Sequence, residues 1–215
     1  MLMKLYSVPH SPYASRVRIQ IRAGALPISV EAPDGGLGSD TFKALTPTGK
    51  VPTLHVDGHY LVESAAIMEY LEERFPDAAL MPKNVEQRAW LRAVSRFSDL
   101  ELAQSLFPLF MELRLKTGDN EAITNNLNAL KAKLATLEKF LQQSNAPDLS
   151  TFGFLDCLLA PVLFYVEKVP AIFGETAIFD ATPHLKTWWQ TSNQHAHVNP
   201  VLEEMAAGLA ASMGG

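Results

Sequence analysis

Apolar positions in the first third of the chain alternate between two spacings. A compact apolar run over Leu2–Val8 predicts a strand, and the stretch from Ser11 to Gly24 carries apolar residues three and four positions apart, which predicts a helix. A second strand is predicted over Leu26–Ala32. Ser39 is a suitable N-cap for a short helix that Pro47 and Gly49 would end. The order therefore begins β-α-β-α.

A hairpin followed by a helix completes this part of the chain. Thr53–Val56 and His59–Val62 flank Asp57-Gly58, the residue pair that favours a type I′ turn, and Ser64 opens a further helical pattern. The resulting order, β-α-β-α-β-β-α, predicts an α/β domain with a mixed four-stranded sheet and helices on both faces.

The pattern becomes helical after Pro76. A long helix is predicted over 84–116, with a kink at Pro108, and a leucine stripe at steps of three and four indicates a bundle helix further on. The stripe comprises Leu127, Leu130, Leu134, Leu137 and Leu141; additional helices are predicted at 153–168, 183–194 and 198–212. We expect an N-terminal domain over 1–76, a linker over 77–84 and an all-helical domain over 85–215.

Composition excludes several functional classes. The 215 residues are 47% hydrophobic and carry a formal net charge of -5, so the chain lacks the basic field that nucleic acid requires. The single cysteine, Cys157, cannot form an internal disulfide; it lies in an apolar stretch and is interpreted as a core residue. The first residues lack the pattern of a secretory signal, and Asp156 interrupts the most apolar segment. We expect a cytoplasmic protein with no membrane partner.

Candidate chemistry is concentrated in three clusters of the first 64 residues. In the first, His10–Arg16, a strand passes into a helix, whose N-terminus favours an anion. The Ser11 hydroxyl is placed to donate to a thiolate or oxyanion there, although Ser before Pro is also an ordinary N-cap.

The second cluster, Thr48–Leu54, places Pro52 just ahead of a strand. A cis Val51–Pro52 bond would expose the Val51 N–H and C=O side by side for an extended peptide, although most X–Pro bonds are trans. The third cluster is Glu63-Ser64, where Ser64 is most simply an N-cap and Glu63 a carboxylate near the positive end of a helix.

Taken together, the clusters strongly resemble the cytosolic glutathione transferases. The most specific motif is Pro47–Leu54 (PTGKVPTL), followed nine residues after Leu54 by Glu63-Ser64. The opening Ser-Pro-Tyr-Ala-Ser-Arg resembles the serine-type classes (zeta, tau and theta-like), with the active serine five positions before the arginine. The resemblance implies a thioredoxin-like domain, a helical domain, a homodimer, and a detoxifying transfer of glutathione, as co-substrate, to small electrophiles without a metal.

The resemblance also assigns roles to individual residues. Ser11 would activate the thiol of glutathione, and Pro52 would be cis. The tripeptide would be held by the Val51 main chain, by Glu63 and Ser64 at the γ-glutamyl end, and by Lys50 at the glycyl end. Walls of the second-substrate pocket are expected from Tyr13, Phe107, Phe110 and Met111.

Several alternatives stay open. Tyr6 is a second candidate hydroxyl donor, as in the tyrosine-type classes, and Ser15 and His10 are lesser rivals. Arg16 and Arg18 are interpreted as structural ion-pair partners. The histidines show no metal-ligand spacing. Gly153 stands where the family usually has a helix-capping Ser or Thr, three residues before an Asp.

Two competing functions also remain. One is a glutathione-dependent isomerase of an unsaturated dicarboxylic acid, whose family members carry Ser-Ser-Cys-Ser where this chain reads Ser11-Pro12-Tyr13-Ala14. The other is a transferase-like binding or stress-response protein without turnover. Failure of the protein to bind glutathione would favour the binding or stress-response protein.

Overall fold

The computed structural model describes residues 3–213, and it confirms the predicted order of elements in the first part of the chain. Leu2, at the start of the first predicted strand, lies outside the described residues. The elements are β1 (Met3–Tyr6), α1 (Pro12–Ala23), β2 (Ile28–Glu31), α2 (Asp40–Leu45), β3 (Thr53–Val56), β4 (His59–Val62) and α3 (Ser64–Arg74).

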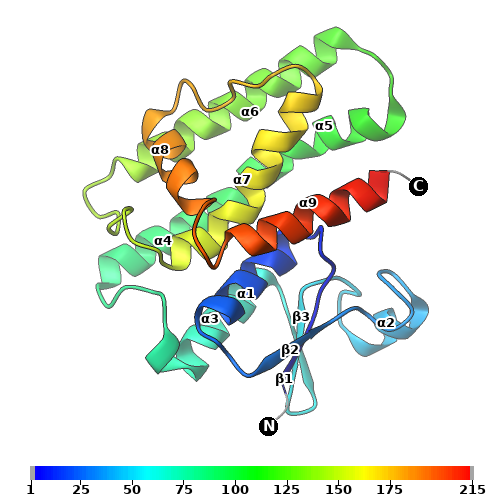
Figure 1. Cartoon of the computed structure of the whole chain (residues 1–215), viewed down its shortest axis with the longest axis vertical. Helices are drawn as coiled ribbons and strands as arrows, with labels where there is room; N and C mark the ends of the chain where they lie inside the picture. Colours follow the sequence, from blue (N-terminus) through cyan, green and yellow to red (C-terminus); the bar gives the residue numbers. More distant parts are fainter. Residues whose placement is uncertain (1–2, 214–215) are drawn as a thin grey trace. The chain divides into compact units, whose positions relative to one another are not determined.

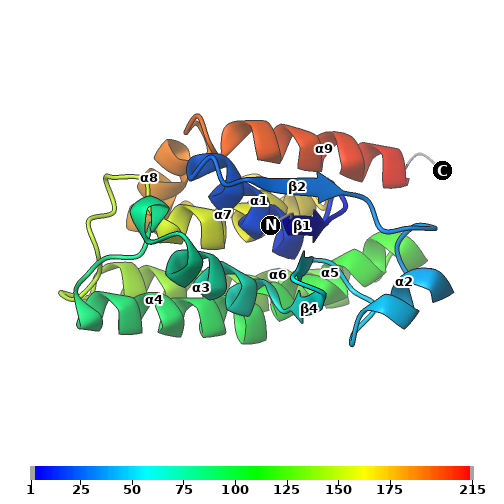
Figure 2. The ribbon, with the colours of Figure 1, turned by 90° about the horizontal axis from the view of Figure 1, so that it is seen from below.

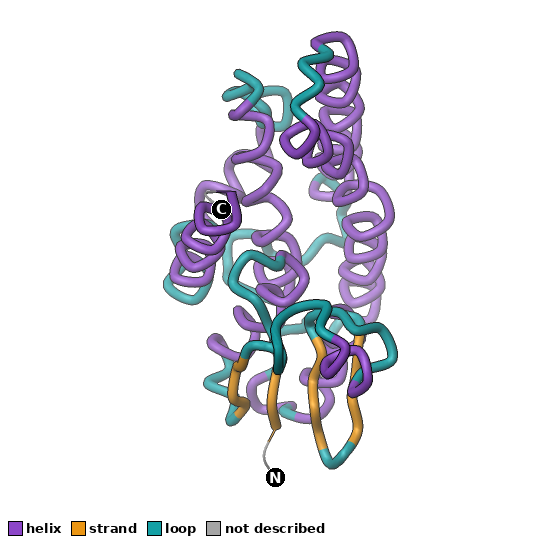
Figure 3. Tube along the Cα trace, turned by 90° about the vertical axis from the view of Figure 1, so that its right-hand side faces the viewer, coloured by secondary structure: helices purple, strands orange, loops and turns teal. Residues whose placement is uncertain are grey.

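The four strands form one mixed sheet in the order β2-β1-β3-β4 (Figure 3). β1 pairs with β2 in parallel, and β3 pairs with β1 and β4 antiparallel. α1 packs with α3, and α3 contacts β3 and β4. On the other side of the sheet, Phe42 of α2 meets the ring of Tyr6 edge-on at 5.4 Å. Helices thus cover both faces, as predicted.

Local turn chemistry explains the strand limits. Asp57 and Gly58 both have positive φ, 51° and 81°, which is the backbone of the expected type I′ turn. β2 begins later than predicted because the backbone N–H of Leu26 donates to the C=O of Ile21, at 3.0 Å, and so prolongs the end of α1.

Two compact units make up the chain. The first comprises residues up to 81, residues 156–161 and residues from 193 onward; the second comprises residues 82–155 and 162–192. The functional division into 1–76 and 85–215 stays a prediction, and residues 1, 2, 214 and 215 within those limits lie outside the described residues.

The rest of the described chain is helical, as the apolar spacing predicts. Its elements are the 3₁₀ turn Pro76–Ala78, α4 (Val85–Phe97), the π-helical turn Ser98–Leu102, α5 (Ala103–Leu115), α6 (Asn120–Leu141), α7 (Phe154–Ile172), α8 (Pro183–Ser192) and α9 (Asn199–Met213), of which the main helices are labelled in Figure 1. The single helix predicted over 84–116 is interrupted by the π-helical turn, whereas Pro108 lies inside α5. α7 begins at Phe154, directly after Gly153. Among the helices of residues 3–213, none combines the length and the hydrophobicity of a membrane span.

A buried carboxylate joins α6 to α8 in the second unit. Glu138, 7% exposed, accepts hydrogen bonds from the backbone N–H groups of His184 at 3.0 Å and Leu185 at 2.9 Å, and the His184 Nδ1 lies 2.7 Å from it. It therefore satisfies N–H groups in the first turn of α8, which have no partner within the helix. Burial raises the pKa of Glu138, but these hydrogen bonds outweigh burial and lower it.

We expect Glu138→Gln to cost about 2 kcal/mol of unfolding free energy at neutral pH, because it removes a charged acceptor of several hydrogen bonds. Since the folded pKa lies below the ordinary value of 4.5, the charge stabilises the native state above that pH and ceases to do so as the pH falls through the folded value. The variant should therefore lose less stability than the wild type on acidification. Urea unfolding between pH 7 and pH 3 tests this, with the exposed Glu101→Gln as the control. If the unfolding free energy fell equally with pH in the wild type, Glu138→Gln and Glu101→Gln, the prediction would be contradicted.

Candidate active site

The register of the sheet brings the three predicted clusters to one edge. Tyr6, Thr53 and Val62 lie in a single row across β1, β3 and β4, because Tyr6 pairs with Thr53 and Thr53 pairs with Val62. β1 leaves this row toward Ser11, β3 enters it from Pro52, and β4 leaves it toward Glu63. Three separate segments of the first 64 residues therefore meet at the same end of the sheet.

Ser11 caps the N-terminus of α1. Its Oγ accepts a hydrogen bond from the backbone N–H of Ala14 at 3.2 Å, and Pro12 fills the first helical position. A hydroxyl that accepts from the backbone still has its own O–H to donate. Capping and donation to an anion are therefore compatible in Ser11, whose side chain lies at the positive end of the helix.

The turn before β3 is fixed by its threonines. The Oγ1 of Thr46 accepts from the N–H of Gly49 at 2.8 Å, and the Oγ1 of Thr53 donates to the C=O of Lys50 at 2.7 Å. Gly49 has φ 63°, and a Cβ there would lie 2.7 Å from the Cγ of Lys43. The Val51–Pro52 bond is cis, as the family resemblance implies, and the ladder of β3 begins only at Thr53. The Val51 main chain thus lies beyond the ladder, and the Lys50 side chain is exposed.

Glu63 and Ser64 depart from the predicted capping arrangement. Ser64 is not the N-cap: α3 begins at Ser64, and Glu63 occupies the cap position with no side-chain hydrogen bond to the helix. Glu63 has φ 69° and ψ 113°, a backbone conformation that costs a non-glycine residue on the order of 1–3 kcal/mol. The Glu63 side chain is exposed, and the Ser64 side chain is buried.

Arg16 lies beneath Ser64. Its side chain is fully buried, its Nη1 donates to the Oγ of Ser64 at 3.4 Å, and its guanidinium lies 5.1 Å from the centre of the Tyr13 ring. The structure therefore joins the first and third clusters through a buried positive charge. Sequence analysis interpreted Arg16 as a structural ion-pair partner and did not predict its contact with Ser64. The sequence showed only that an arginine lies on the helix that Ser11 caps.

Comparison with known proteins identifies the family. The glutathione S-transferase N-terminal domain family matches residues 5–79, and its C-terminal domain family matches residues 87–196. The chain belongs to the glutathione S-transferase family. It is 35% identical to a maleylacetoacetate isomerase of Dictyostelium discoideum in an alignment of 184 positions, which covers 77% of this chain and 82% of that protein.

A further curated relative and a solved structure are also similar to this chain. A stringent starvation protein A homolog of Histophilus somni is 29% identical over 175 residues, covering 81% of this chain and 80% of that protein. The crystal structure of a Tau class glutathione S-transferase from mango, Mangifera indica, is similar with a TM-score of 0.81 and 22% identity, and the match covers 98% of each chain.

The rival hydroxyls of the transferase differ from Ser11 in their surroundings. Tyr6 is buried against Phe42, and burial raises its pKa, which makes it a weaker proton donor. The Ser15 hydroxyl donates to the C=O of Pro9 at 3.5 Å and is fully buried. His10 is half-buried.

The predicted second-substrate residues of the transferase lie in different surroundings. Tyr13 lies on α1 beside Arg16. On α5, Phe107 is 61% exposed, and Phe110 meets the ring of Tyr165 edge-on at 5.3 Å. Met111 is half-buried. Their role as pocket walls stays a prediction.

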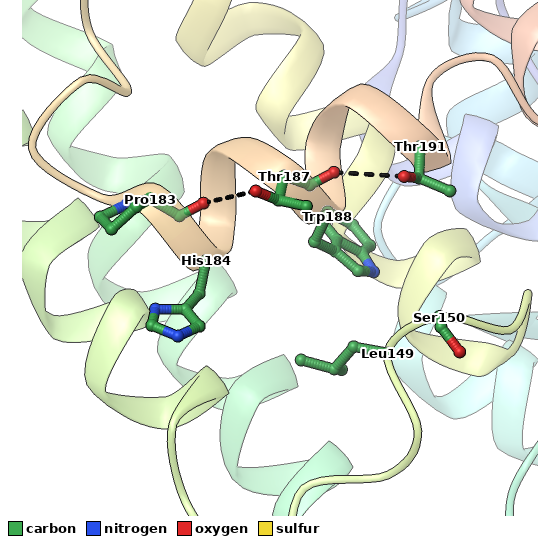
Figure 4. A pocket seen from close by; sticks show the side chains of 7 residues that line it. All are labelled: Leu149, Ser150, Pro183, His184, Thr187, Trp188 and Thr191. Carbon is green, nitrogen blue, oxygen red and sulfur yellow. Dashed lines mark hydrogen bonds between the residues drawn. The ribbon is translucent and has the colours of Figure 1, made fainter.

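A cavity of about 430 Å³ lies within the second unit (Figure 4). The hydroxyls of Thr187 and Thr191 donate to backbone carbonyls of α8, so they are already used within the helix. None of the predicted site residues contributes to its lining, which comprises Leu149, Ser150, Pro183, His184, Thr187, Trp188 and Thr191.

Cys157 is fully buried, as expected for a core residue, and burial raises the pKa of its thiol. Among residues 3–213, no three His, Cys, Asp or Glu side chains are grouped so that they could hold a metal ion.

Proposed function

We propose that this transferase binds glutathione at the sheet edge formed by residues 11, 50–52 and 63–64 and activates its thiol with Ser11. The observation that carries the proposal is the Ser11 cap, in which the Oγ accepts from Ala14 and leaves the O–H available at the N-terminus of α1. Membership of the glutathione S-transferase family supports this assignment.

The chemistry requires a thiolate. A free thiol has a pKa of about 8.5, so only a few per cent is ionised at neutral pH. A hydrogen bond from Ser11 and the dipole of α1 would together lower the pKa of the thiol by about one to two units. The thiolate then attacks an electrophilic carbon, an S–C bond forms, and the leaving group departs with the bonding electron pair while the thiol proton passes to solvent.

The γ-glutamyl end of glutathione carries an ammonium and a carboxylate. Glu63 is a partner for the ammonium, and the Ser64 hydroxyl is a donor for the carboxylate. Because the Ser64 Oγ accepts from Arg16, its own hydrogen points away from Arg16 and would donate to the carboxylate of a bound ligand. The Val51 main chain would pair with the cysteinyl unit, and Lys50 with the glycyl carboxylate.

The test is a pH titration of the protein with glutathione, followed by thiolate absorbance. We expect binding with a thiol pKa about one to two units below that of free glutathione. Binding without a lower pKa would exclude thiol activation. No binding would favour the role of a stress-response protein, which the starvation-protein homolog keeps as a candidate.

A second candidate is cis–trans isomerisation of an unsaturated dicarboxylic acid, which the 35% identity to a maleylacetoacetate isomerase favours. The thiolate would add to one carbon of the double bond, rotation would follow, and elimination would return glutathione unchanged. Residues 12–14 read Pro-Tyr-Ala, without the cysteine of the Ser-Ser-Cys-Ser run. Catalytic isomerisation of maleylacetoacetate without consumption of glutathione would establish this function.

The small electrophile, the homodimer and a cytoplasmic location are part of the same proposal. They rest on the properties that the family resemblance implies. Sedimentation of the purified chain tests the dimer directly.

A further inference from the structure

The loop that carries Ser11 is held by the C-terminal helix. Residues 7–11, here called the serine turn, connect β1 to α1, and the N–H of Ser11 donates to the C=O of Val8 at 3.1 Å within it. α9 belongs to the same compact unit as this turn and packs along α1 (Figures 1 and 2). Nearly 200 residues of sequence separate the turn from α9.

Arg18 makes the first connection. Its side chain is 8% exposed; its Nη1 donates to the C=O of Pro9 at 3.3 Å and to the Oγ of Ser15 at 3.4 Å, while its Nη2 forms an ion pair with Glu204 of α9. Burial lowers the pKa of Arg18, but an arginine keeps its charge at every pH at which the protein folds. The buried guanidinium therefore needs its acceptors, and Glu204 is the one that carries a full negative charge.

Gly208 makes the second connection. A Cβ at this position would lie 2.9 Å from the Cβ of Pro9 and 3.1 Å from the backbone N of His10. The backbone of α9 is therefore in direct contact with the serine turn one helical turn after Glu204. The two nearest atoms are the ring Cβ of Pro9 and the backbone N of His10, and neither is the end of a flexible side chain that could move aside.

We propose that α9 is a positioning element for Ser11, with Glu204 acting through Arg18 and Gly208 acting through direct contact with the serine turn. Pro9 and His10 are fixed by α9, and Ser11 follows them at the cap of α1. A hydrogen bond from Ser11 to a thiolate weakens when its length or angle changes, so a small shift of the turn raises the pKa of the bound thiol. This inference rests on the proposed function of Ser11.

The test compares Glu204→Gln with Glu203→Gln, which removes the same charge from the adjacent exposed position of α9. In the ligand-free protein, we expect Glu204→Gln to accelerate hydrogen exchange roughly fivefold in the segment 7–15, and Glu203→Gln to leave it unchanged. With glutathione, Glu204→Gln should raise the thiol pKa by about half a unit and lower kcat at neutral pH while KM stays the same.

Gly208→Ala provides an independent variant. Alanine in place of glycine normally stabilises a helix interior, so a variant acting on α9 alone would unfold at a higher temperature. We expect instead faster exchange in 7–15 and a higher thiol pKa, because the new Cβ displaces the serine turn.

The outcomes separate the two proposals. Unchanged exchange in 7–15 for both Glu204→Gln and Gly208→Ala would overturn the positioning role, whatever the ligand does. Faster exchange with an unchanged thiol pKa would overturn the link from α9 to catalysis. A wild-type protein that binds no glutathione would overturn the proposed function and the catalytic link with it, while exchange in the same three variants would still decide whether α9 holds the turn.

Discussion

Replacing Ser11 by alanine is expected to raise the pKa of the bound glutathione thiol by about one to two units and to lower kcat at neutral pH about tenfold to a hundredfold. The reason is the loss of the Ser11 hydroxyl, which lies at the N-terminus of α1. KM for glutathione should change little, because the tripeptide is held by the turn before β3 and by Glu63 and Ser64. Thiolate absorbance and the pH–rate profile measure both effects.

The capping role of Ser11 needs its own control, because losing an N-cap costs about 1 kcal/mol of stability. Ser39 caps α2 in the same way, accepting from the N–H of Phe42 at 3.2 Å, and lies outside the candidate site. Ser39→Ala should reproduce the loss of stability and leave the thiol pKa unchanged. Tyr6→Phe tests the rival donor. If Tyr6→Phe raised the thiol pKa and Ser11→Ala did not, Tyr6 would be the donor.

Local sequence signals predicted the elements of the N-terminal part well. The order of strands and helices follows from short-range patterns such as the Asp57-Gly58 turn and the Ser11-Pro12 helix start, and the structure confirms both. The predicted limits of strands and helices were less accurate where backbone hydrogen bonds differ from those of a regular helix end or helix interior. β2 starts later than predicted because the backbone N–H of Leu26 donates to a C=O of α1. The long helix predicted over 84–116 contains a π-helical turn, and that turn has no glycine or proline from which it could have been predicted.

The family resemblance implied Ser11, Val51, Pro52, Glu63 and Ser64 as site residues, and their role in binding glutathione stays a prediction. The sheet register brings their segments to one edge, but the contacts that connect them were not predicted. The positive φ of Glu63 reversed the expected capping role of Ser64, because a strained backbone is set by packing rather than by propensity. The burial of Arg16 under Ser64 and the contact of α9 with the serine turn are long-range, and a single sequence carries no periodic signal for either.

Replacing Arg16 by methionine is expected to raise KM for glutathione about tenfold to a hundredfold, with a smaller change in kcat. The guanidinium directs the Ser64 hydroxyl and supplies a buried positive charge near the proposed position of the γ-glutamyl carboxylate. Methionine is long, flexible and apolar, so it fills much of the buried space without introducing a new polar group that would need a partner. Urea unfolding shows whether the variant is folded, and exposed Arg22→Met on the same helix is the matched control.

A double-mutant cycle with Ser64→Ala separates the two contributions of Arg16. If Arg16 acts through Ser64, the double variant should raise KM little beyond the larger single effect, because both changes remove the same interaction. The preference for glutathione over cysteinylglycine, which lacks the γ-glutamyl group, should fall in each variant, while kinetics with the dipeptide stay nearly constant. Additive effects on KM would mean that Arg16 acts on the carboxylate by charge alone. An unchanged preference would show that neither residue recognises the γ-glutamyl end.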